Sequence, residues 1–208
     1  RLSALAGSFF IWGMLTPQAL GSFSAAQRLF APVTEAAWLF ATPLIAAMSM
    51  VQAQPRIFRM QLTALTQLLV ACSCGIAVAG QYVAPLVLQL LYGQQYSQGP
   101  ASAVAVFQWL SLALGFALVT PVLAVACLAQ GRERLLMQAS LAGLALNLAL
   151  NAVLVPAQGP LGAAMAWCAS EALVMLTLLV SAVRRADVSA GWDWLAYLAP
   201  AAGLALVL

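Results

Sequence analysis

The chain of 208 residues contains no histidine and no lysine, and charged residues make up only 6% of it. A soluble domain carries about a quarter charged residues, so the composition excludes an ordinary water-soluble fold. The missing histidine removes the commonest general base and metal ligand, which argues against an enzyme. The positive net charge of +3 comes from arginines, most of which lie in short turns, a distribution that indicates membrane topology and not nucleic-acid binding.

Long apolar runs are what the chain has in abundance: 64% of it is hydrophobic and the mean hydropathy is +0.99. A helix rises ~1.5 Å per residue, so about 20 apolar residues cross a hydrocarbon core ~30 Å thick. Lipid offers no hydrogen bonds to the backbone, so spanning segments must satisfy their own amides as helices do. We therefore predict an all-α, polytopic transmembrane bundle of about six to seven spans.

The third apolar segment is longer than one span, and we expect it to cross between Met60 and Gly80. Its remainder, Ala84–Tyr92 behind Pro85, is then expected to form a short helix at the membrane interface. The sequence shows no signal peptide, starts without methionine and stops inside an apolar run, so we infer part of a longer protein. The seven predicted segments are 2–15, 23–50, 60–91, 101–127, 135–155, 161–183 and 194–208.

Arginines alternate with uncharged turns along the chain. Arg1 precedes the first segment, and arginine pairs follow the second, fourth and sixth segments. The turns at 16–22, 93–100 and 156–160 carry no charge. Because positive residues concentrate in cytoplasmic loops, we predict that the arginine-bearing turns are cytoplasmic and the uncharged turns periplasmic.

Small and polar residues form stripes in the fifth and sixth segments, which a Pro156–Pro160 turn joins into a predicted antiparallel hairpin. Such stripes let helices approach closely in lipid. Counting from the turn places Asn147 and Glu171 at similar depth; the asparagines either only join the two helices or serve the function directly. The stripes are Ala139, Gly143, Asn147 and Asn151, and Gly162, Ala166 and Ser170.

The four cysteines all lie in apolar runs, which favours small buried thiols. Cys72 and Cys74 are two residues apart and so point to different sides of a helix. No histidine is present to complete a metal site with them, and we predict no cofactor.

The stretch LAQGRERLLMQASLAGLALNLALNAVLVPAQGPLGAAMAWCASE, at 128–171, resembles the bacterial polysaccharide (O-antigen) flippases. GSFSAAQRLFAPV and LLYGQQYSQGPASAVAVFQWLSLAL resemble two further motifs of that family, in the same order. The resemblance implies the multidrug/oligosaccharidyl-lipid/polysaccharide exporter superfamily, whose members have two six-helix lobes around a central cavity. Residues 1–208 would then form the second lobe, corresponding to helices seven to thirteen, with the N-terminal lobe absent.

The expected function is therefore translocation of an undecaprenyl-diphosphate-linked oligosaccharide across the bacterial inner membrane, with proton or sodium coupling left open. An anionic diphosphate favours a bidentate arginine, and Arg28 is the arginine best placed to reach into the membrane. Glu35 lies two turns further along the same helix face, past Pro32. We expect Arg28 and Glu35 to bind substrate; the alternative is an arginine that reaches lipid headgroups and a protonated glutamate in packing.

Three alternatives remain open at this point. A lipid II flippase is a close alternative, because half a chain separates it poorly from a polysaccharide flippase. A drug or organic-cation antiporter of the same superfamily would use a membrane carboxylate, Glu35 or Glu171. A glycan polymerase or acyltransferase would need catalytic histidine or charged periplasmic loops, and the predicted periplasmic turns are short and uncharged.

Overall fold

The computed structural model describes residues 2–51, 53–93 and 103–185, and every regular element in these ranges is an α-helix. Within them, all helices except the short α1 are long and apolar enough to cross a membrane. This confirms the predicted all-α bundle of spanning helices; the seventh predicted segment, 194–208, lies outside the described residues. The helices are α1 (Leu2–Met14), α2 (Pro17–Val51), α3 (Pro55–Tyr92), α4 (Ala103–Ala129), α5 (Glu133–Gln158) and α6 (Pro160–Arg185).

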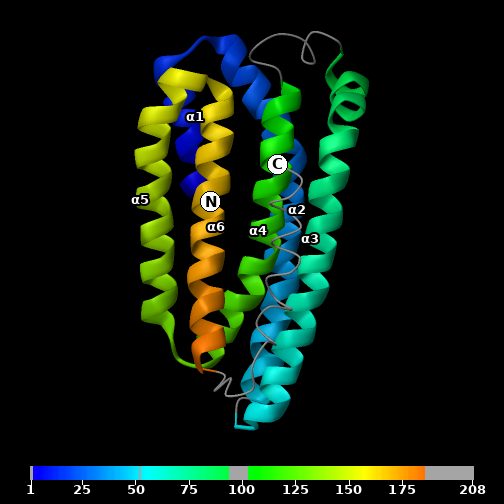
Figure 1. The fold of residues 1–208 in the computed structure, drawn as a ribbon, viewed down its shortest axis with the longest axis vertical. Coiled ribbons are helices and arrows are strands. Elements are labelled where there is room, and N and C mark those ends of the chain that lie inside the picture. Colours follow the sequence, from blue (N-terminus) through cyan, green and yellow to red (C-terminus); the bar gives the residue numbers. More distant parts are fainter. Residues whose placement is uncertain (1, 52, 94–102, 186–208) are drawn as a thin grey trace.

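The central element is α4, which packs against α2, α3 and α6, while α5 lies on the outer side of α6 (Figure 1). The sequence of α4 is apolar on all sides, AVAVFQWLSLALGFALVTPVLAVACLA, as expected for a helix surrounded by other helices. The short α1 packs against α5 and α6. This arrangement leaves one face each of α2, α3 and α5 on the outside of the bundle.

The largest buried cluster combines aromatic and aliphatic side chains, most of them from α1, α2, α4 and α6. Phe23 is fully buried there, and the rings of Phe30 and Phe107 lie with their centroids 4.6 Å apart. Trp167 of α6 is buried in the same cluster. Lipid is as apolar as these side chains, so close packing between them holds the helices together more than exclusion of water does.

The structure corrects the prediction for α3, which continues through Pro85 to Tyr92 as one helix of 38 residues. The expected separate interfacial helix is wrong because Ala84 and Leu88 are fully buried in the main core cluster. A proline inside a helix removes one hydrogen bond and bends the helix without ending it when the rest is well packed. Figure 1 shows the last turns of α3 bending while the helix continues.

The turn between α5 and α6 is shorter than predicted. Pro156 lies inside α5, Pro160 begins α6, and Gly159 alone connects the two helices. Gly159 has φ = 64°, a left-handed conformation that glycine adopts without strain, and its N–H donates to the Val155 carbonyl at 2.9 Å. The predicted antiparallel hairpin is confirmed, with a turn of one residue in place of five.

The helices run alternately up and down, so the connections collect at two ends of the bundle (Figure 1). One end holds the α2–α3 turn, the α4–α5 turn and the end of α6; we call residues 53–59, 130–134 and 182–185 the arginine-rich end. The other end holds the α1–α2 and α5–α6 connections and carries no charged residue between 156 and 162 or between 15 and 22. The arginine-bearing turns, which alternate with uncharged turns along the sequence, therefore lie together at one end of the bundle.

Candidate functional site

The candidate polar residues of α5 lie on the face that contacts α6. Asn147 and Asn151 are fully buried, and the remaining small residues of both predicted stripes are buried with them. A Cβ added at Gly162 would collide with the main-chain carbonyl of Leu154, and one at Gly143 would meet a Val174 methyl group. The small residues therefore allow α5 and α6 to approach backbone to backbone.

A continuous set of hydrogen bonds joins these helices. Asn151 Nδ2 donates to Asn147 Oδ1 at 3.0 Å and to the Asn147 main-chain carbonyl at 2.8 Å. Asn147 Nδ2 donates to Ser170 Oγ at 3.2 Å, and Ser170 Oγ donates to the Trp167 carbonyl at 2.8 Å. Polar contacts of this kind stabilise membrane helix pairs by ~0.6 kcal/mol on average. Asn147 therefore acts at least as a helix–helix contact.

Glu171 lies beside this contact, half-buried in α6. Its Oε1 accepts a hydrogen bond of 3.1 Å from Trp167 Nε1, one helical turn earlier. Because Asn147 contacts Ser170, the neighbour of Glu171 in sequence, Asn147 and Glu171 lie at similar depth in the bundle. A carboxyl group is thus held within a spanning helix by a neutral donor.

Arg28 and Glu35 lie on α2, two helical turns apart on one face, which is about 10 Å along the axis. Arg28 is exposed and Glu35 is partly buried, with Pro32 between them inside the helix. Further along this face Trp38 is also exposed. The opposite face of α2 carries the buried stripe Ala19, Phe23, Ala26 and Phe30. The charged face therefore points away from the core of this bundle.

The structure does not gather the five candidate residues into one site. The charged pair of α2 belongs to a helix that packs chiefly on α4, whereas Asn147, Asn151 and Glu171 belong to the α5–α6 hairpin on the other side of the bundle (Figure 1). The hairpin residues form an internal contact, and the pair on α2 is presented outward. Among the five candidate residues, only the pair on α2 therefore lies on an outer face of the described bundle.

A polar contact that sequence reasoning missed lies between α3 and α4. Gln108 Nε2 donates to the Gln81 main-chain carbonyl at 3.0 Å, and Gln81 Nε2 donates to the Gln108 carbonyl at 3.2 Å. Pro85 has no N–H, so the carbonyl four residues earlier, that of Gln81, lacks its partner within the helix. Gln108 supplies the missing donor from the neighbouring helix. The available signal was a proline four residues after one glutamine, with a second glutamine alone in an apolar run.

The four cysteines are free thiols: Cys127 and Cys168 are buried and Cys74 is partly buried, while Cys72 is exposed. The prediction of a buried thiol is wrong at Cys72, because residues two apart point to opposite sides of a helix and only one can face α4. Across the described residues, no group of three or more cysteine, aspartate or glutamate side chains is placed to hold a metal ion.

Comparisons of the chain with protein-family models, with curated proteins and with solved structures found no match. What the fold and composition define is a class, an α-helical membrane protein whose helices alternate in direction.

Proposed function

We propose that this chain is one lobe of a transporter that moves an undecaprenyl-diphosphate-linked oligosaccharide across the bacterial inner membrane. The observation that carries the proposal is the outward-facing pair Arg28 and Glu35 on the membrane helix α2. The choice of substrate within transporters rests on the sequence resemblance to polysaccharide flippases.

Depth along α2 makes the two charges costly in lipid. Arg28 is eleven residues from the start of α2 at Pro17, about 16 Å along the axis, and Glu35 is about 27 Å along. A charge at such depth needs water or a polar partner, because hydrocarbon offers neither. A hydrated cavity on this face, closed by a second lobe, would supply water to the exposed guanidinium of Arg28.

The chemistry of the pair suits an anionic head group. The guanidinium of Arg28 can donate two parallel hydrogen bonds to a diphosphate, a geometry that lysine cannot provide. Glu35, about 10 Å further along the face, reduces the net positive charge so that the diphosphate is bound and then released. Pro32, between them, lets the helix bend there when the cavity opens from one side to the other.

Substitution of Arg28 in the full-length protein tests this proposal. Arg28→Lys keeps the charge but loses the bidentate geometry, and Arg28→Ala loses both, so we expect both to impair export of surface polysaccharide at normal protein levels. If Arg28 only reaches lipid headgroups, Arg28→Lys will export normally.

Arg134→Ala is the matched control, because Arg134 is also exposed but lies at the arginine-rich end, outside the α2 face. We expect this variant to export normally. Full export by Arg28→Ala, at an expression level equal to that of the control, would contradict a substrate-binding role for the α2 face.

A further inference from the structure

The arginine-rich end concentrates charge that no part of the proposed transport path uses. Six arginines and one acid, Glu133, lie within residues 53–59, 130–134 and 182–185. They come from three separate chain segments that the alternation of the helices brings to one end (Figure 1). The arginines are Arg56, Arg59, Arg132, Arg134, Arg184 and Arg185.

One of these arginines has a structural role. Arg132 Nη1 donates to the Ser181 carbonyl at 3.4 Å, which ties the α4–α5 turn to the last turns of α6. Cations near the C-terminal carbonyls of a helix are favourable because those carbonyls carry partial negative charge. This contact holds two of the three charged segments side by side.

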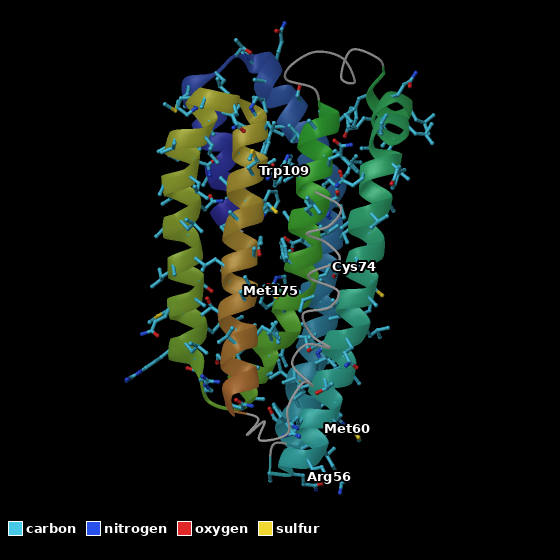
Figure 2. All side chains as sticks on the ribbon, in the orientation of Figure 1. Arg56, Met60, Cys74, Trp109 and Met175 are labelled. Atoms are coloured by element: carbon cyan, nitrogen blue, oxygen red, sulfur yellow. The ribbon has the colours of Figure 1, made fainter. Side chains whose placement is uncertain are left out.

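The other described arginines are exposed beside apolar side chains. Arg56 and Arg59 are separated by one helical turn on α3, and Met60 next to them is 66% exposed. Arg134 is followed one turn later by Met137, which is 57% exposed. Figure 2 shows Arg56 and Met60 at the same extremity of the bundle, with Met60 on the side toward its centre. Each group therefore places an apolar side chain toward the acyl region and a guanidinium at headgroup level.

We propose that the arginine-rich end is a binding surface for anionic phospholipid headgroups. A phosphodiester is the anion available at this depth, and guanidinium groups bind phosphate through paired hydrogen bonds. Clusters of four to eight arginines or lysines next to membrane helices attract anionic lipid. At the opposite end, the connections at 15–22 and 156–162 carry no charged residue, so we assign the lipid preference to the arginine-rich end.

The test is the lipid preference of the full-length protein reconstituted in phosphatidylcholine vesicles that contain trace spin-labelled lipid. Electron paramagnetic resonance measures the fraction of labelled phosphatidylglycerol or phosphatidylcholine that the protein immobilises. We expect roughly fivefold preference for phosphatidylglycerol at one engaged arginine, and about twofold or more averaged over all lipids around the bundle. Salt at about 0.5 M should reduce the preference because it screens the headgroup charge.

Three variants locate the surface. We expect the ratio of immobilised phosphatidylglycerol to phosphatidylcholine to fall toward about 1 in the triple variant Arg56→Gln/Arg59→Gln/Arg134→Gln. Lysine at the same three positions should keep most of the preference. Gln61→Ala/Gln138→Ala, at exposed uncharged positions near the same end, should leave it unchanged. An equal preference in the triple glutamine variant, or no preference and no salt effect in the unmodified protein, would overturn the proposal. The measurement needs no transport activity, so its outcome is independent of the proposed function.

Discussion

Glycine residues, which have a hydrogen atom in place of a side chain, allow the close approach of α5 and α6. Two glycines of this hairpin and one of α3 differ in which atoms an added methyl group would contact. At Gly162 the methyl group would collide with the Leu154 carbonyl, which is backbone and cannot turn aside. At Gly143 the closest atom is a methyl group of Val174, which can rotate, although the Ser170 carbonyl lies 3.4 Å away. At Gly75 on α3 nothing lies within 4 Å.

These differences predict an order of stability for three alanine substitutions. Gly162→Ala should lower the free energy of unfolding most, at the upper end of the ~1–3 kcal/mol typical of overpacking. Gly143→Ala should cost less, and Gly75→Ala should be neutral or stabilise by up to ~1 kcal/mol, since alanine favours the helix. Reversible unfolding of the protein in bicelles measures all three, and equal stability of the Gly162 and Gly75 variants would contradict the predicted close approach.

At the scale of the element, α3 shows how a membrane helix continues past a proline. Pro85 has no N–H to donate to the Gln81 carbonyl, and this carbonyl instead accepts a hydrogen bond from Gln108 of α4. Transfer of an unpaired carbonyl into pure hydrocarbon costs several kcal/mol. Leaving a buried carbonyl unpaired in a protein costs about 1–3 kcal/mol, as measured with mutants. The continuity of α3 is thus a property of the α3–α4 pair.

A double-mutant cycle tests this account. Gln108→Leu should destabilise the protein by ~1–3 kcal/mol because it leaves the Gln81 carbonyl unpaired. In a Pro85→Ala background the new N–H at position 85 serves that carbonyl, so the same substitution should cost about 1 kcal/mol less. Gln89→Leu, at an exposed position of α3, should show no such dependence on residue 85. Equal costs of Gln108→Leu in both backgrounds would contradict the account.

At the scale of the whole molecule, the separation of charge between the two ends predicts an orientation in the membrane. Gln130 in the α4–α5 turn and Gln158 at the end of α5 are both exposed and lie at opposite ends of the bundle. Because basic residues favour the cytoplasmic side, Gln130 should lie in the cytoplasm and Gln158 in the periplasm.

Labelling of single cysteines in intact cells measures the orientation. In a background with the four native cysteines changed to alanine, Gln158→Cys should react with a membrane-impermeant maleimide, and Gln130→Cys should react only after permeabilisation. Reaction of both variants after permeabilisation is the control for accessibility. Reaction of position 130 alone in intact cells would reverse the proposed topology.

Much of the fold follows from the sequence because lipid leaves the backbone few options. The apolar runs predicted helices, and the stripes of small and polar residues at 139–151 and 162–170 predicted a closely packed hairpin. The positions of the arginines predicted which turns lie at the same end of the bundle. Each of these signals is local, since a helix satisfies its own hydrogen bonds and a stripe repeats within one helix. The binding roles of Arg28 and Glu35 remain predictions, because helix periodicity places the two residues on one face of α2 and does not identify what that face contacts.

Only the tertiary structure decided features that depend on contacts between distant segments. Pro85 predicted a break in α3, and the side chain of Gln108, on another helix, made continuation favourable. Cys72 and Cys74 looked alike in sequence, and the position of α4 determined which of them is exposed. The packing of α2 on α4, and of α5 on α6, separated Arg28 and Glu35 from the buried asparagines. Helix periodicity defines the faces of one helix, but which face meets which neighbour depends on shape and polar matching across the whole bundle.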